Sequence, residues 1–219
     1  MLSQTEENYL KAIYHIEASH VKNVSTTLIS KSLVTKASSV TDMLRKLADK
    51  KLVNYEKYKG VKLTTEGKSI ALKIVRRHRL WEVFLVEKLN YNWDEVHDIA
   101  EQLEHIKSNS LIDKLEVFLN FPTHDPHGDP IPDSKGNLNI KETVLLSNAK
   151  EGVLYKIATV KDNSKSLLQF LDKHALTLDS EITILDKFDF DDSVTVKLQQ
   201  ENTLTLSKKI CENVFVTIK

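Results

Sequence analysis

Apolar side chains in the first hundred residues repeat with the 3.6-residue period of amphipathic helices. The period predicts three helices at the start of the chain, over residues 3–18, 25–32 and 36–50. Ser3 and Glu6 form a capping box at the start of the first helix, and Ser25 or Thr26 caps the second. Two short strands, 52–57 and 61–63, follow directly and predict a β-hairpin. Together these elements predict a winged helix-turn-helix domain over residues 1–63.

The pattern changes twice further along the chain. Long apolar faces predict helices over residues 66–88 and 94–106. All four prolines then fall within residues 121–132, which predicts a loop. Short alternating runs predict the strands of a small β-barrel, with one helix over 164–174, and the strands cover residues 153–160, 181–187, 194–198, 203–206 and 214–218. We therefore expect an α+β protein with a helical domain over 64–140 and an SH3-like barrel over 148–219.

The charge distribution separates the two ends of the chain. The formal net charge is 0, yet residues 1–80 hold sixteen Lys and Arg against seven Asp and Glu, and residues 81–219 hold fifteen against twenty-four. This asymmetry favours a polyanion partner at the front and cation binding behind it. A single cysteine, Cys211, excludes an intrachain disulfide. The chain shows no apolar run near eighteen residues and its start is polar, so we expect a cytoplasmic protein without membrane association.

The predicted third helix has the residue pattern of a helix that reads DNA. Its inward face is apolar, while small polar groups gather at its N-terminal end, as in a helix that enters the major groove. Basic residues of the hairpin are suited to phosphate contacts. The predicted DNA-binding residues are Thr27, Lys36, Ser38, Ser39, Thr41, Asp42, Arg45, Lys57, Tyr58 and Lys59. A small protein-binding module with a solvated basic face is the alternative interpretation.

Candidate metal ligands gather between residues 76 and 105. On a helix over 94–106, four polar side chains share one stripe beside an apolar one, namely His97, Glu101, Glu104 and His105. On the preceding helix, His78 and Glu82 lie one turn apart. Carboxylates so close together repel one another unless a cation lies between them. A ligand set without thiolate favours Mn²⁺ or Fe²⁺ over a structural zinc ion.

The proline-rich loop adds a second group of polar side chains, His124, Asp125, His127 and Asp129. They are either further ligands or ordinary loop residues. Asp162, in the turn before the helix of the barrel, is one more candidate ligand.

The sequence resembles the metal-dependent repressors typified by the diphtheria toxin repressor and the manganese transport regulator. The resemblance covers nearly the whole chain and rests on 7-ENYL-10, 76-RRHRL-80 with Glu82, 96-VHD-98, 104-EH-105, 126-PHG-128 and 131-IP-132. It implies two neighbouring metal positions on His78, Glu82, Glu101, Glu104 and His105, with His97 as an ancillary ligand. In longer manganese-type members, Asp125, His127 and Asp162 would also ligate. Glu101 stands where iron-type members have Cys, so the resemblance favours Mn²⁺ over Fe²⁺, with one or two ions per subunit left open.

Two residues depart from the family pattern. Asn8 occupies a ligand position that is usually Asp or Met, and Lys11 replaces a Glu of some manganese-type members. The resemblance also implies a repressor of metal-uptake genes that binds an inverted-repeat operator as a homodimer. We expect its dimer surface within residues 65–120, from Trp81, Phe84, Leu85, Leu111, Leu115, Phe118 and Leu119. A dinuclear-metal hydrolase and a metal-independent interaction module are the alternative functions, although no nucleophile motif or phosphate loop supports an enzyme.

Overall fold

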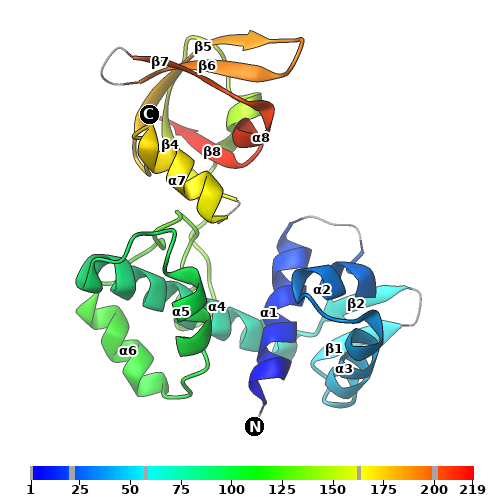
Figure 1. The fold of residues 1–219 in the computed structure, drawn as a ribbon. Coiled ribbons are helices and arrows are strands. Elements are labelled where there is room, and N and C mark those ends of the chain that lie inside the picture. The colour runs from blue at the N-terminus through cyan, green and yellow to red at the C-terminus, as the bar shows by residue number, and fades with distance from the viewer. Residues whose placement is uncertain (1, 20–22, 57–58, 162–163, 199–201) are drawn as a thin grey trace. The chain divides into compact units, whose positions relative to one another are not determined.

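The computed structural model describes residues 2–19, 23–56, 59–161, 164–198 and 202–219 (Figure 1). The chain forms two compact units. Unit 1 contains residues 1–78, 101–110 and 132–137, and unit 2 contains residues 79–100, 111–131 and 138–219. Among the described residues, no helix is both long and apolar enough to cross a membrane.

Unit 1 begins with the three predicted helices, α1 (Gln4–Ala18), α2 (Thr26–Ser32) and α3 (Ala37–Asp49). The capping box is confirmed, because the Ser3 hydroxyl accepts from the Glu6 backbone N–H at 3.3 Å and the Glu6 carboxylate accepts from the Ser3 N–H at 2.9 Å. Ser25 caps α2 by accepting from the N–H of Leu28 at 3.2 Å. The predicted helix starts are therefore set by local hydrogen bonds.

A β-hairpin of β1 (Val53–Glu56) and β2 (Gly60–Leu63) follows α3. The strands are antiparallel, with Val53 opposite Leu63. Gly60 has a φ of +94°, and a Cβ there would lie 2.0 Å from the Asn23 side-chain oxygen, so this turn requires glycine. Helix α1 contacts α2, α3 and β2 around a core of fully buried side chains that includes Leu10, Ile13, Ile29, Leu44 and Leu47. The predicted winged helix-turn-helix is confirmed.

Helix α4 (Thr65–Leu89) matches its prediction and runs from unit 1 into unit 2. The predicted helix over 94–106 is too long, because helix α5 covers only His97–Leu103. A turn precedes it, in which the Glu95 N–H bonds the Asn92 carbonyl at 3.0 Å, and another follows it, in which the Ile106 N–H bonds the Leu103 carbonyl at 3.1 Å. Helix α6 (Asn109–Phe118) comes next.

The C-terminal part of unit 2 is a six-stranded antiparallel sheet with the order β3-β8-β4-β5-β6-β7. The five predicted strands and one helix are confirmed as β4 (Leu154–Val160), β5 (Glu181–Phe188), β6 (Ser193–Leu198), β7 (Thr203–Leu206), β8 (Val214–Ile218) and α7 (Lys165–Lys173). Three shorter elements, β3 (Val144–Leu145), the 3-10 turn η1 (Leu146–Asn148) and α8 (Lys208–Cys211), were not predicted. They are too short to show a hydrophobic period.

Candidate metal centres and DNA-binding face

The first candidate centre lies in unit 1, where α1 meets residues 101–105. The Glu104 side chain is fully buried. Its Oε2 accepts hydrogen bonds from the Lys11 ammonium at 2.7 Å and from the His78 Nδ1 at 2.6 Å. The same ammonium lies 3.3 Å from the Glu101 Oε1. One lysine of α1 is therefore shared by two of the predicted ligands.

The imidazole of His105 is oriented by a second acidic residue of α1. Its Nδ1 donates to the Glu7 Oε2 at 2.7 Å, so the lone pair of the neutral ring lies on Nε2. That Nε2 lies 3.9 Å from the Glu104 Oε1. A carboxylate behind a histidine in this way is common where histidine binds a metal. Glu7 was not among the predicted site residues, because its role depends on a contact almost a hundred residues away in sequence.

Two buried oxygens in unit 1 suit a cation. Within the described part of the chain, the Glu104 Oε1 and the Asn8 Oδ1 are buried without a hydrogen-bond partner. A buried oxygen left unpaired is costly, and a bound ion would satisfy it. Burial by itself raises the pKa of Glu104, but the hydrogen bond from His78 and the charge of Lys11 bring it below its usual value. The carboxylate and imidazole groups of this centre therefore fit a divalent ion.

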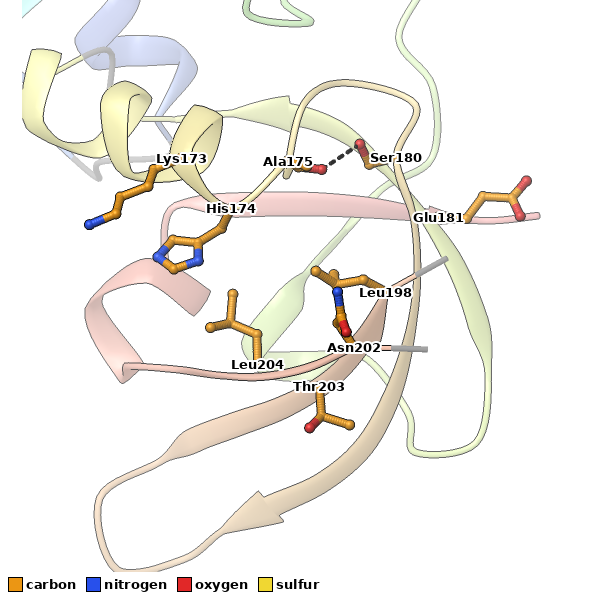
Figure 2. A pocket seen from close by; sticks show the side chains of 9 residues that line it. All are labelled: Lys173, His174, Ala175, Ser180, Glu181, Leu198, Asn202, Thr203 and Leu204. Atoms are coloured by element: carbon orange, nitrogen blue, oxygen red, sulfur yellow. Dashed lines mark hydrogen bonds between the residues drawn. The ribbon is translucent and has the colours of Figure 1, made fainter. Parts of the chain in front are cut away.

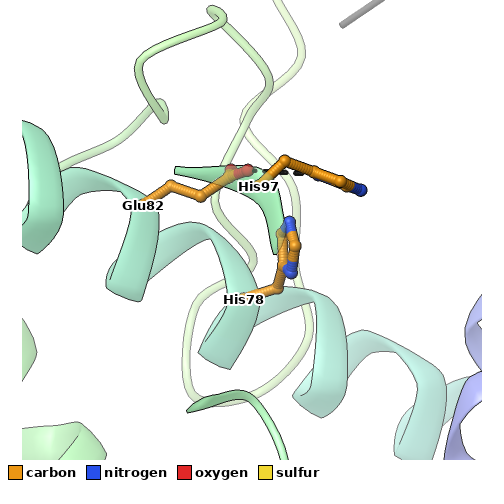
Figure 3. Close-up of side chains that lie close together, drawn as sticks. All are labelled: His78, Glu82 and His97. Carbon is orange, nitrogen blue, oxygen red and sulfur yellow. Dashed lines mark ion pairs between the residues drawn. The ribbon is translucent and has the colours of Figure 1, made fainter. Parts of the chain in front are cut away.

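Two further groups share Glu82, which is 1% exposed and lies one turn after His78 on α4. In the first, ligand atoms of His78, Glu82 and His97 lie within 4.8 Å of one another. Figure 3 shows the three side chains and the ion pair of 3.5 Å between the His97 Nδ1 and the Glu82 Oε1. In the second, Glu82, Asp125 and His127 are all buried, and their ligand atoms likewise lie within 4.8 Å of one another. The predicted loop ligands Asp125 and His127 thus lie beside the helical ones.

Asp125, a candidate ligand, also holds the backbone of the proline-rich loop in place. The Asp125 Oδ1 accepts from the backbone N–H of His127 at 2.8 Å and of Asp129 at 3.0 Å. Its other oxygen pairs with the Arg79 guanidinium at 3.3 Å. Burial, followed by the charges of Glu82 and Asp129, raises the pKa of Asp125 to about 7. This centre thus places buried carboxyl groups against one another.

Trp93 fixes the orientation of His127. The His127 Nε2 donates to the Trp93 carbonyl at 2.9 Å, and the two rings stack with centroids 6.0 Å apart. The other ring nitrogen, Nδ1, faces Glu82 and lies 3.8 Å from its Oε2. Burial opposes the charged imidazole, but Glu82 and then Asp125 raise the pKa of His127 to about 9. The Trp93 indole donates to Asp172 of α7 at 2.8 Å, so this centre is joined to the barrel domain.

The prediction that His97, Glu101, Glu104 and His105 share one helix is wrong for the last two residues. Because α5 ends at Leu103, the side chains of Glu104 and His105 project from a turn and contact α1. His97 instead lies at the start of α5, beside Glu82. Two loop residues held open as ligands are not members of these groups: His124 bonds Thr123, and Asp129 pairs with Arg79. Asp162 lies outside the described residues.

The DNA-binding face predicted on α3 is accessible. Its exposed side chains are Lys36, Ser38, Ser39, Asp42 and Arg45, and Thr27 of α2 is also exposed. Thr41 is half-buried and donates to the Ala37 carbonyl at 3.1 Å. In the hairpin, the exposed Lys59 pairs with Glu56 at 2.7 Å, while Lys57 and Tyr58 lie outside the described residues.

Helix α1 also contacts the C-terminal end of α3. The Glu6 Oε1 lies 2.6 Å from the Lys50 ammonium and 3.1 Å from that of Lys46. Burial by itself raises the pKa of Glu6, but the hydrogen bonds from Lys50, the Ser3 backbone and Lys46 lower it to about 2. Two consecutive residues of α1 therefore contact different parts of unit 1. Glu6 pairs with lysines at the end of α3, the predicted DNA-reading helix, and Glu7 bonds His105 of the candidate metal centre.

A pocket of about 360 Å³ lies in the C-terminal domain, and its lining includes none of the residues of these centres (Figure 2). Its lining includes one imidazole and one carboxylate, His174 and Glu181. Glu181 already pairs with the Lys219 ammonium at 2.6 Å. The Ser180 hydroxyl, also in the lining, donates to the Ala175 carbonyl at 3.2 Å. This lining shows no cluster of metal ligands among the described residues.

Three family models match the chain in sequence order. Residues 1–61 match the iron dependent repressor N-terminal DNA-binding domain, residues 64–133 match the iron dependent repressor metal-binding and dimerisation domain, and residues 144–218 match the FeoA domain. The DNA-binding and dimerisation domains indicate DNA and a second copy of the chain as partners. These domains and the ligand clusters define a metal-dependent transcriptional repressor and not an enzyme, so the hydrolase and the metal-independent module are excluded.

Individual relatives agree with this class. The chain is 37% identical over 122 residues to the HTH-type transcriptional regulator MntR of Oceanobacillus iheyensis, covering 55% of this chain and 81% of that protein. It is 33% identical over 131 residues to the iron-dependent repressor IdeR of Mycobacterium leprae, covering 60% of this chain and 56% of that protein. A solved manganese-dependent transcriptional repressor in complex with manganese superposes with a TM-score of 0.90 at 34% identity, covering 98% and 100% of the two chains. The chain belongs to the family of the diphtheria toxin repressor, IdeR and MntR.

Proposed function

We propose that the protein is a manganese-responsive repressor of metal-uptake genes, with Fe²⁺ as the alternative co-repressor. The observation that carries the proposal is the cluster of Glu101, Glu104 and His105, in which a buried carboxylate oxygen has no hydrogen-bond partner among the described residues. Oxygen and imidazole ligands suit manganese and ferrous ions. The single cysteine of the sequence, Cys211, lies buried at the end of α8, and burial raises the pKa of its thiol to about 11, so it remains protonated.

We assign two ions to each subunit. One is held by Asn8, Glu104 and His105, with Glu101 at the exposed side of the cluster. The other is held by the groups around Glu82, which include His78, His97, Asp125 and His127. The support for the second is the crowding of Glu82 and Asp125, whose buried carboxyl groups disfavour one another's charged form.

The chain's own contacts join the first centre to the reading helix. A bound ion supplies the positive charge that lets the carboxylates of this centre stay close together. Glu7 orients His105, and Asn8, the next residue of α1, has a buried side-chain oxygen without a hydrogen-bond partner among the described residues. One residue earlier, Glu6 binds the two lysines of α3. An ion that adds to the contacts between α1 and this centre would therefore also restrict the position of α3 within unit 1.

The helices of residues 65–120 provide the proposed dimer surface. Of the seven residues expected there, Trp81, Leu85, Leu115 and Leu119 are buried within the chain itself, so they form its core. Phe84 is half-buried, whereas Leu111 is 40% exposed and Phe118 is 62% exposed. Val117 is 60% exposed next to Phe118. Exposed apolar side chains gathered in this way are typical of an interface. A symmetric dimer would fit an inverted-repeat operator.

Fluorescence anisotropy with the promoter DNA of its own gene tests the proposal. The labelled DNA is titrated with protein in chelator, and again in about 0.1 mM Mn²⁺ or Fe²⁺ under anaerobic conditions. We expect Mn²⁺ to lower the Kd for the promoter at least about 100-fold relative to chelator, and relative to an unrelated DNA of equal length. Glu66→Gln, an exposed residue at the start of α4, serves as the control. Equal binding in chelator and Mn²⁺ would contradict the proposed function.

A further inference from the structure

Lys11 places a fixed positive charge inside the first metal centre. Lys11 is 9% exposed, and its ammonium lies 2.7 Å from the Glu104 Oε2 and 3.3 Å from the Glu101 Oε1. A lysine side chain carries its charge on four rotatable bonds and seldom becomes this buried unless it is paired. Its contacts are with two carboxylates of the proposed ligand set. Lys11 is therefore part of the electrostatics of the centre and not a solvated helix residue.

The ammonium occupies only one of the two oxygens of Glu104. Its Oε2 receives both Lys11 and His78, whereas the Oε1 lies 3.9 Å from the His105 Nε2 and has no hydrogen-bond partner among the described residues. One half of the carboxylate is thus neutralised by the chain, and the other half is available to an ion. A fully buried carboxylate without any partner would be strongly destabilising. The lysine removes most of that cost when no metal is bound.

We propose that Lys11 is an internal cation that holds α1 against residues 101–104 in the metal-free protein and sets the metal concentration at which the repressor responds. The inference rests on the proposed function, since it assigns a role to a residue of the same centre. A fixed positive charge beside Glu101 and Glu104 reduces the attraction that these carboxylates exert on a divalent ion. The centre therefore gives up metal affinity in exchange for a first helix that stays in place without metal.

Thermal unfolding in chelator tests the structural half of this proposal. Lys11→Met keeps the aliphatic stem but removes the charge, and we expect its Tm in chelator to fall by about 5 °C. Lys11→Arg keeps the charge and should stay within about 2 °C of the wild type. Lys73→Met, an exposed lysine of α4, is the matched control and should leave the Tm unchanged.

Titration calorimetry with Mn²⁺ tests the other half. Both chains carry Glu82→Gln, which changes the ligand that the two groups of the second centre share, so that the heat reports on the first. We expect Lys11→Met to bind Mn²⁺ at least about tenfold more tightly than its Glu82→Gln parent, because the fixed charge has been removed. If Lys11→Met unfolds in chelator and Mn²⁺ restores the fold, the proposal is supported as well.

Three results would overturn the inference: an unchanged Tm of Lys11→Met in chelator, an unchanged or weaker Mn²⁺ affinity, or a variant that stays unfolded with and without Mn²⁺. These outcomes are distinct from a failure of the proposed function. The Tm is measured without metal or DNA, and the proposed function fails only if promoter binding by the wild type ignores metal.

Discussion

The two candidate metal centres use the same ligand types but differ in what surrounds them. In unit 1, the carboxylates of Glu101 and Glu104 share a lysine ammonium, and the histidine is oriented by a residue of α1. In unit 2, Glu82 and Asp125 lie close to one another, and the guanidinium of Arg79 pairs with Asp125 and also with Asp129. The negative charge of the first centre is therefore partly neutralised before metal binds, whereas in the second centre the carboxyl groups of Glu82 and Asp125 still disfavour one another's charged form.

The centres also differ in what they are attached to. The first is joined through α1 to the reading helix α3, by the contact of Glu6 with Lys46 and Lys50. The second is joined through Trp93 to α7 of the barrel domain, by the bond to Asp172. This difference suggests that metal in the first centre controls DNA binding directly, while metal in the second orders the barrel.

Glu104→Gln should have the largest effect of any single change. It removes the charge that holds both the ion and Lys11, so we expect Mn²⁺-dependent promoter affinity to fall by about 100-fold. Anisotropy in saturating Mn²⁺ measures the loss. A Glu104→Gln protein that binds Mn²⁺ poorly but binds the promoter as tightly as the wild type would contradict the link between this centre and α3.

Glu6→Gln tests the contact between α1 and α3. We expect it to lower the free energy of unfolding by about 2 kcal/mol at pH 7, since it removes a charged hydrogen bond from a buried site. The pKa of Glu6 is lowered from 4.5 to about 2 in the folded chain. Its contribution to stability is therefore present above about pH 4.5 and is lost as the pH falls towards 2.

Urea unfolding at several pH values checks this sign. The difference in stability between the wild type and Glu6→Gln should shrink as the pH drops below about 4.5. A difference that stays constant down to pH 3 would show that the ionised Glu6 does not stabilise the fold.

Asp125→Asn sharpens the comparison from the side of unit 2. It weakens the second centre but leaves α1 and α3 untouched, so promoter affinity in saturating Mn²⁺ should fall by less than about threefold. Equilibrium dialysis should show one bound ion fewer per chain than in the wild type. A loss of DNA binding as large as that of Glu104→Gln would make the two centres equivalent and remove the distinction.

Trp93→Phe should have a small effect that is confined to unit 2. It keeps an aromatic ring beside His127 but removes the bond to Asp172, and we expect a loss of about 1 kcal/mol in the stability of unit 2. Hydrogen exchange of the α7 amides should rise while exchange in α3 stays as in the wild type. Faster exchange in α3 instead would contradict the assignment of this centre to the barrel.

Much of the fold could be predicted because its signals are local. The Ser3 capping box, the Ser25 cap and the apolar period of α4 each lie within a few turns of sequence. The end of α5 at Leu103 could not be predicted in this way, because Glu104 and His105 are held by contacts with α1. The period of the side chains continues past a helix end that tertiary contacts decide.

The candidate site shows the same limit. Most of the predicted ligands occur in the three clusters, since their residue types and spacing already indicate metal chemistry. Glu7, Lys11 and Trp93 acquire their roles only in three dimensions. Lys11 departs from the family pattern, but nothing in the sequence places its ammonium between Glu101 and Glu104. The proposal that Lys11 lowers the metal affinity therefore depends on these three-dimensional contacts and not on the sequence.

Anomalous scattering at the manganese edge tests the central claim most directly. Crystals of the full chain grown with Mn²⁺ and operator DNA should show a peak within coordination distance of the Glu104 Oε1 and the His105 Nε2, and a second peak beside Glu82. Manganese found only beside Glu82, in crystals where the protein is bound to its operator, would contradict the account.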